Sequence, residues 1–173
     1  MISSGRVAAA MIDYYRNDCL RVNHFLKVFG FAKTIGEQEG LDQETLEILE
    51  IAALTHDIGI KASEAKYQSS AGKYQQTEGP PLAEKMLAEL DFQPNLIERV
   101  CWLIAHHHDY QSVQLPDHRI LVEADFLVNA YEEGLPRQAI LEVREQIFRT
   151  RTGMDLLENL YGPLDPVSGS GRL

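Results

Sequence analysis

Apolar residues recur at a spacing near 3.6 along almost the whole chain, which is the spacing that places side chains on one face of an α-helix. The periodic segments cover residues 25–35, 46–53, 82–90, 97–104, 121–131 and 140–147. No stretch alternates between polar and apolar residues long enough to predict a strand. The pattern predicts an all-α fold, a single-domain helical bundle. Segment 46–53 is apolar on most sides, so we expect it at the centre of the bundle.

Residues that cap or break helices fall between these segments. Gly40 separates the first two segments, and Asp42 is well suited to cap the start of the second. Pro80, Pro94 and Pro136 each fall just ahead of a periodic segment, where proline is tolerated at the first helical position. These prolines therefore predict three further helix starts.

Two stretches lack the helical period. Residues 61–79 are polar and include two glycines, which predicts the one long loop of the chain, and such loops in compact domains are often functional. Residues 162–173 contain two prolines and three glycines and predict a flexible C-terminal tail. We therefore expect one helical domain over residues 1–161, followed by this tail.

The charge of the chain limits the partners it can bind. Its 173 residues carry a formal net charge of −10, which argues against long nucleic acid, because proteins that bind it need a basic face. A bound metal cation could still reverse the local field and admit one small anionic substrate. The apolar run at residues 7–12 is too short for a secretory signal, and no run approaches the ~18 apolar residues of a membrane span. We expect a cytoplasmic protein that does not bind membranes, and the oligomeric state stays open.

Several other features are expected to be structural. Cys19 and Cys101 form no CxxC pair, so we interpret them as reduced thiols that pack as small hydrophobic side chains. Trp102 and the six phenylalanines occur at helical spacing and are expected in the core. His118 lies in the polar segment 115–119 and is expected in a surface loop.

Ionisable side chains occur in apolar surroundings at several places. His56 and Asp57 directly follow the apolar residues 51–55, and Asp125 lies within the apolar segment 121–128. Removing such groups from water is unfavourable unless they are paired or bound to a metal. Taken singly, a buried histidine is more often a hydrogen-bonded core residue, and a helical aspartate is more often a cap or an ion-pair partner. Taken together, imidazole and carboxylate groups suit Mn, Fe, Co, Ni or Zn ions.

The chain presents four potential metal ligands in order: His24, His56, Asp57 and Asp125. This order resembles the HD-domain superfamily of metal-dependent phosphohydrolases. The flanking residues are similar too: 21–28 (RVNHFLKV) resemble the first ligand helix of the family, 52–59 (AALTHDIG) the end of its central helix, and 123–129 (EADFLVN) its final helix. The resemblance covers roughly residues 20–132.

The resemblance implies a helical bundle that binds one divalent cation (Mn, Fe, Co, Ni, Zn or Mg) through these four residues. Water and a phosphate oxygen of the substrate would fill the remaining positions. The cation would acidify its bound water into a nucleophile, and Asp57 would orient that water as well as bind the metal. The implied activity is hydrolysis of a phosphoester in a small phosphorylated metabolite, such as a nucleotide.

Some members of the family hold a second metal through further histidines. His106 and His107 resemble that cluster. A third histidine, His108, leaves the register His107-His108 open as well, and all three cannot meet one ion because adjacent helical residues diverge by ~100°. The family usually has another histidine four residues before a glycine, where this chain has Gln75 before Gly79, and glutamine is a poor ligand for transition metals. One metal is therefore expected, with two as the alternative.

Other polar residues near these motifs are candidates for catalysis or substrate binding. Glu78 is a candidate metal ligand, a candidate general acid, or a favourable charge near the start of the following helix, and these three roles stay open. In the family a lysine often directly follows the HDIG motif. Here Ile60 takes that position and Lys61 comes next. Lys61 and Lys73 are candidate phosphate contacts and Gln75 a candidate substrate contact, although a solvated loop explains the lysines equally well.

Two other functions are consistent with the sequence. A few relatives use a two-iron site to oxidise carbon with dioxygen, which His106 and His107 would permit and Gln75 disfavours. A catalytically silent module that senses nucleotides would keep the fold and the metal without turnover. Two irons and oxygen consumption would indicate the first, and tight nucleotide binding without hydrolysis would indicate the second.

Overall fold

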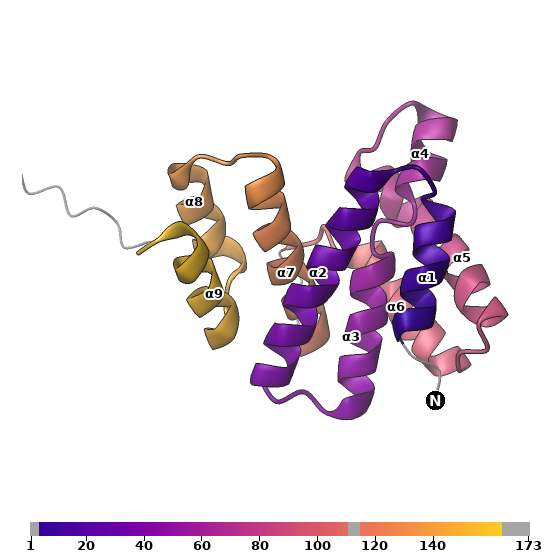
Figure 1. Cartoon of the computed structure of the whole chain (residues 1–173), viewed down its shortest axis with the longest axis horizontal. Helices are drawn as coiled ribbons and strands as arrows, with labels where there is room; N and C mark the ends of the chain where they lie inside the picture. Colours follow the sequence, from indigo (N-terminus) through magenta and orange to yellow (C-terminus); the bar gives the residue numbers. More distant parts are fainter. Residues whose placement is uncertain (1–3, 111–114, 164–173) are drawn as a thin grey trace, which may run out of the picture.

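The computed structural model describes residues 4–110 and 115–163, and the regular secondary structure in these ranges is helical throughout (Figure 1). The helices are α1 (Ser4–Tyr14), α2 (Cys19–Gln38), α3 (Gln43–Thr55), α4 (Ile60–Tyr67), α5 (Gly72–Glu89), α6 (Pro94–His106), α7 (Pro116–Glu132), α8 (Arg137–Ile147) and α9 (Arg151–Tyr161). The predicted all-α fold is confirmed. None of the helices in the described ranges is long and apolar enough to cross a membrane. The predicted tail lies, apart from its first two residues, outside the described residues.

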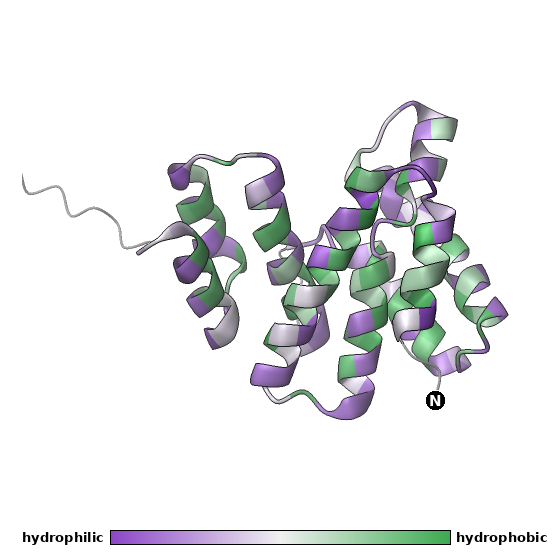
Figure 2. Cartoon of the chain, in the orientation of Figure 1, coloured by the Kyte–Doolittle hydropathy of each residue, from purple (hydrophilic) through white to green (hydrophobic). Residues whose placement is uncertain are grey.

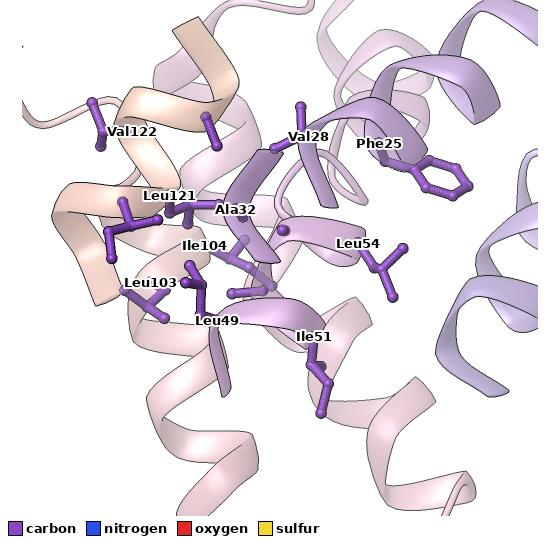
Figure 3. Close-up of a cluster of buried hydrophobic side chains, with 14 of the residues drawn as sticks. Phe25, Val28, Ala32, Leu49, Ile51, Leu54, Leu103, Ile104, Leu121 and Val122 are labelled. Atoms are coloured by element: carbon purple, nitrogen blue, oxygen red, sulfur yellow. The ribbon is translucent and has the colours of Figure 1, made fainter. Parts of the chain in front are cut away.

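Helix α3 forms the centre of the bundle. It packs against α1, α2, α6 and α7, and its apolar side chains between residues 49 and 54 are fully buried. Figure 3 shows Leu49, Ile51 and Leu54 of α3 among side chains from α2, α6 and α7. Figure 2 shows hydrophobic and hydrophilic residues on the same helices, as expected for amphipathic helices that bury one side. The predicted central position of segment 46–53 is confirmed.

The prediction of one long loop at residues 61–79 is wrong. Helix α4 begins at Ile60, and α5 begins at Gly72. Between them the chain turns at Gln68, which caps α4 in the left-handed conformation (φ 53°). Helix α4 buries only Ser63, and no apolar stripe marks it in the sequence. Its alanines, lysines and glutamate nevertheless favour a helix. A short helix on the outside of the bundle therefore has the polar composition of a loop.

Contrary to the prediction, Pro80 lies inside α5 and does not start it. At this level α5 lies directly against the turn after α3. A Cβ atom on Gly59 would lie 2.7 Å from the Gln75 carbonyl oxygen and 2.8 Å from the Gly79 nitrogen. Glycine at position 59 therefore allows two backbones to approach closely, and this approach fixes α5 beside the turn.

The other predicted helix starts agree with the structure. The Asp42 side chain accepts a hydrogen bond from the Thr45 backbone N–H (3.0 Å) and caps α3. Pro94 is the first residue of α6, and Pro136 immediately precedes α8. Local capping chemistry therefore sets these three helix boundaries.

The prediction that His118 lies in a surface loop is wrong. His118 is fully buried in the first turn of α7, and its Nε2 donates a hydrogen bond to the His106 backbone carbonyl (2.9 Å). Trp102 is more exposed than predicted (37%) and stacks on the His106 ring. Arg99 lies over the Trp102 ring and donates two 2.8 Å hydrogen bonds to Asp117. Because these polar groups bind one another, they join the end of α6 to the start of α7.

The predicted burial of the cysteines holds only for Cys101, whereas Phe25 and Phe148 are buried as predicted. Both cysteines are free, but Cys19 is exposed at the start of α2 and only Cys101 is partly buried. Phe25 and Phe148 are among the largest fully buried side chains, as expected for core residues.

Glu123 is a fully buried carboxylate that holds the turn between α8 and α9. It accepts hydrogen bonds from the backbone N–H groups of Arg149 (2.7 Å) and Thr150 (3.0 Å), and from the Thr150 hydroxyl. Burial raises the pKa of the Glu123 carboxyl, and these hydrogen bonds oppose that rise. A Cβ atom on Gly153 would collide with the carboxylate. The contact therefore fixes the start of α9 against α7.

We expect Glu123→Ala to lower the free energy of unfolding by about 3 kcal/mol, because buried backbone N–H groups lose a charged partner. Glu142→Ala, on the exposed side of α8, is the control and should change the free energy by no more than about 0.5 kcal/mol. Chemical denaturation followed by circular dichroism measures both values. Equal stability of the two variants would contradict the structural role of Glu123.

Candidate metal centre

The four predicted ligands converge where α3 ends. Helix α2 supplies His24, α7 supplies Asp125, and His56 and Asp57 begin the turn after α3. His24 Nε2 lies 3.2 Å from His56 Nε2 and 3.2 Å from Asp125 Oδ1. Asp57 Oδ2 lies 3.4 Å from each of the two Nε2 atoms. Two histidine nitrogens and two carboxylates therefore face the same small space, which we call the primary cluster.

Hydrogen bonds that Nδ1 donates fix the tautomers of three histidines. In each case Nδ1 faces a group that can only accept: the Ala53 carbonyl for His56 (2.9 Å), the Ile104 carbonyl for His107 (2.7 Å) and the Glu132 carboxylate for His24 (2.8 Å). A neutral ring that donates from Nδ1 carries a lone pair on Nε2. The Nε2 atoms of all three rings are therefore available as ligands.

The primary cluster is rich in acceptors and poor in donors. Asp125 Oδ1, and Nε2 of the adjoining His107, are buried without a hydrogen-bond partner. Buried acceptors that face one another without a donor are unfavourable, and a cation between them removes this penalty. Imidazole nitrogens combined with carboxylate oxygens are ligands that divalent transition metals accept. The residues present therefore fit a divalent metal ion.

The charges of the primary cluster attract positive charge. Burial disfavours protonation of His24 and His56, but Asp57 and Asp125 outweigh it and raise the pKa of both rings, that of His56 well above its usual value. Burial also acts to raise the pKa of both aspartates, but the facing histidines hold each pKa well below its usual range. Protons and metal ions should therefore compete for the same nitrogen lone pairs.

Metal binding should weaken as the pH falls. The pKa values of His24 and His56 are raised, so each ring gains a proton and loses its Nε2 lone pair as the pH falls through that value. In the metal-free protein the same protons stabilise the fold fully below about pH 6.5, and this stabilisation is lost as the pH rises through the raised pKa values. Calorimetric titration should show Co²⁺ binding at least about 10-fold tighter near pH 8 than near pH 6. An affinity independent of pH would contradict this assignment.

A second group of ligand atoms adjoins the primary cluster. Asp57, His107 and His108 offer atoms that lie within 4.8 Å of one another, and His107 Nε2 lies 3.7 Å from Asp57 Oδ1. Burial, helped by His107, lowers the pKa of His108 to about 4, so this ring stays neutral. The His106 ring instead stacks on Trp102. Of the two registers that the sequence left open, the structure brings His107-His108, and not His106-His107, to Asp57.

The two predicted phosphate contacts lie on the helices that follow the turn. Lys61 on α4 donates a hydrogen bond to the Tyr14 carbonyl (3.2 Å) and lies over the Tyr14 ring. Lys73 on α5 lies over the Tyr74 ring. Within the described residues, neither lysine forms an ion pair or a hydrogen bond with the primary cluster. Their role as phosphate contacts stays a prediction.

Glu78 and Gln75, both on α5, form hydrogen bonds with residues of α4 and of the segment between α4 and α5. The Glu78 carboxylate accepts hydrogen bonds from Lys66 (2.8 Å) and Tyr67 (2.7 Å), and these two residues lower its pKa. An ionised carboxylate cannot donate a proton, so this geometry opposes the general-acid role and ties α4 to α5. Gln75 is buried; its Nε2 donates to the Ser70 carbonyl (2.6 Å), and its Oε1 has no partner.

Sequence reasoning missed two residues that support the ligands. The Tyr15 hydroxyl donates a 2.7 Å hydrogen bond to the Asp57 carbonyl, and the Glu132 carboxylate accepts one from His24. Glu132 follows Asp125 by seven residues and so lies on the same face of α7, a spacing that the sequence does contain. Tyr15 precedes the first periodic segment, and no pattern pointed to it.

Tyr15→Phe should lower the free energy of unfolding of the metal-free protein by about 1 kcal/mol, because the Asp57 carbonyl loses its hydrogen bond from the side chain. It should also weaken metal binding, because Asp57 is then held less firmly. Tyr14→Phe is the matched control, since the Tyr14 hydroxyl makes only a longer contact with the Ile58 carbonyl (3.3 Å). Thermal denaturation and Co²⁺ titration measure both effects, and equal results for the two variants would exclude a special role for Tyr15.

Comparison with known proteins gives a family and a fold. The chain matches the family model of the HD domain over residues 21–130, and no curated protein matches it. It is similar to the 1.45 Å crystal structure of a predicted HD superfamily hydrolase from an uncultured Thermotogales bacterium, with a TM-score of 0.66 and 21% identity over 91% of this chain and 84% of that one. At this identity the likeness shows a shared fold alone. The family match spans more than half of the chain and includes the whole primary cluster, and the chain therefore belongs to the HD domain family.

Proposed function

We propose that the protein is a metal-dependent phosphohydrolase that cleaves a phosphoester of a small phosphorylated metabolite, such as a nucleotide. The observation that carries this proposal is the convergence of two histidine Nε2 atoms and two carboxylates in the primary cluster, where each Nε2 atom lies 3.2–3.5 Å from the other and from an oxygen of each carboxylate. Membership of the HD domain family supports it. The net charge of −10 favours a small substrate over long nucleic acid, and a cytoplasmic location is part of the proposal.

The chain's own residues have distinct roles in this mechanism. His24, His56, Asp57 and Asp125 would hold one divalent ion, which when bound acidifies a water ligand and draws charge from the phosphoryl oxygens. Asp57 directs Oδ2 towards His24 and His56, whereas its Oδ1 faces His107. The lowered pKa keeps Asp57 ionised, so its Oδ1 can accept a hydrogen bond from the attacking water and orient it.

Substrate binding is proposed for the side of the cluster next to α4 and α5. Lys61 and Lys73 are not paired with a carboxylate within the described part of the chain, so their charges are available to a phosphate. The Gln75 backbone lies beside the turn after α3 and its side-chain Oε1 is buried without a partner, so a substrate contact through Gln75 requires this side chain to turn outwards and stays part of the proposal. For Glu78 we propose a structural role at the contact between α4 and α5.

A second ion is the alternative that one observation favours. Asp57 faces both the primary cluster and the pair His107-His108, so it could bridge two ions. Two irons per chain together with oxygen consumption would indicate the oxygenase chemistry known from a few relatives. Tight nucleotide binding without hydrolysis would instead indicate a silent sensor.

The purified protein should release phosphate from at least one nucleotide or sugar phosphate when supplied with Mn²⁺, Co²⁺, Ni²⁺, Mg²⁺ or Zn²⁺, and a chelator should stop the release. His56→Ala and Asp57→Ala should each reduce the rate by about three orders of magnitude or more, because a bound ion contributes several kcal/mol to stabilising the transition state. Their circular dichroism should stay helical. A colorimetric phosphate assay measures the rates.

His106→Ala is the matched control for this experiment, because the His106 ring stacks on Trp102 and does not face Asp57. It should keep the wild-type rate. Full activity in Asp57→Ala, or an equal loss in His106→Ala and His56→Ala, would contradict the assigned centre.

A further inference from the structure

We propose that Glu132 is a positioning residue for His24, which holds the imidazole in the orientation and tautomer that present Nε2 to the metal ion. The inference rests on the proposed function, because it takes His24 as a metal ligand. Glu132 is the last residue of α7 and lies beyond residues 21–130, the segment that matches the family model. It is therefore a feature of this chain that the family match does not cover.

The Glu132 carboxylate binds two side chains of α2. Its Oε2 accepts a hydrogen bond from His24 Nδ1 at 2.8 Å, and its Oε1 accepts one from Lys27 Nζ. The His24 side chain is 11% exposed and the Glu132 side chain 30% exposed. Their hydrogen bond is therefore partly shielded from water, which strengthens a bond to a charged acceptor.

Lys27 fixes the direction of the carboxylate. It follows His24 by three residues, so both side chains leave the same face of α2. With one oxygen bound to Lys27 and the other to His24, the Glu132 carboxylate is held at both ends. This arrangement also keeps the Glu132 carboxylate outside the primary cluster, where it would act as a further ligand of the ion.

The same two helices supply both the ligands and their support. Helix α2 carries His24 and Lys27, and α7 carries Asp125 and Glu132, two helical turns apart. The two helices pack against each other, and Figure 1 shows them side by side. The contact between Glu132 and His24 therefore joins the same two helices that place Asp125 beside His24.

A carboxylate behind a metal-binding imidazole has known physical consequences. It fixes the tautomer, limits rotation of the ring and makes the ligating nitrogen more basic. Loss of such a partner typically lowers metal affinity by about 10- to 100-fold. Glutamine at the same position keeps an oxygen that accepts the hydrogen bond but lacks the charge.

The test is calorimetric titration of the full, metal-free chain with Co²⁺ and without substrate. Glu132→Ala should bind Co²⁺ about 10- to 100-fold more weakly than the wild type, and Glu132→Gln should recover most of this loss. Glu133→Ala is the matched control, because it removes an equal charge from the adjacent, exposed position. It should bind within about twofold of the wild type, because exposed charges are screened.

A second readout separates positioning from general stability. In the Zn²⁺-loaded wild type, nitrogen NMR should show His24 protonated at Nδ1 and metal-bound through Nε2, and in Glu132→Ala this signal should broaden or shift. The unfolding midpoint of metal-free Glu132→Ala should fall by no more than about 4 °C, because the pair with Lys27 is partly exposed. Glu132→Gln provides the NMR comparison if the alanine variant does not fold.

The outcomes distinguish this inference from the proposed function. Wild-type Co²⁺ affinity in Glu132→Ala, or an equal loss in Glu133→Ala, would overturn the positioning role while leaving the metal centre intact. A wild-type chain that binds no Co²⁺ would overturn the metal centre itself. Phosphate release plays no part in this measurement, so an unidentified substrate cannot obscure the result.

Discussion

The structure depends on a group of buried acceptors placed where α3 ends. His56 is fully buried, and its Nε2 lies 3.2 Å from that of His24, with the carboxylates of Asp57 and Asp125 beside both. In an apolar core such a group is unfavourable unless positive charge lies among it. The bundle can hold it because α3 is packed on several sides by other helices. The core that stabilises the fold therefore also fixes the directions of the ligands.

Each neighbouring helix adds one constraint to this centre. Tyr15, directly after α1, holds the Asp57 backbone, and α5 approaches the same turn at Gly59. His107, which directly follows α6, faces the second oxygen of Asp57. Helix α7 supplies a ligand and, through Glu132, the partner of a ligand on α2. Asp57 is the residue on which most of these constraints act, which agrees with its proposed double role as metal ligand and water-orienting group.

The sequence predicted what local chemistry and periodicity determine. Burial of α3 and the Asp42 cap follow from apolar spacing and local capping. The grouping of His24 with His56 and Asp57 followed instead from the resemblance of their order and flanking residues to the HD-domain superfamily. The α4 helix was missed because it buries almost nothing, and the buried state of His118 was missed because its acceptor is a distant carbonyl. The choice between the two histidine registers depends on how α6 rotates in the bundle, which three identical side chains in a row cannot reveal.

The central claim is that one divalent ion binds among four named side chains, and anomalous diffraction from crystals grown with Co²⁺ tests it most directly. The account predicts an anomalous peak about 2.0–2.3 Å from Nε2 of His24 and His56 and from a carboxylate oxygen of Asp57 and of Asp125. A well-occupied peak that lies elsewhere, with ordered protein and no density among these four side chains, would contradict it.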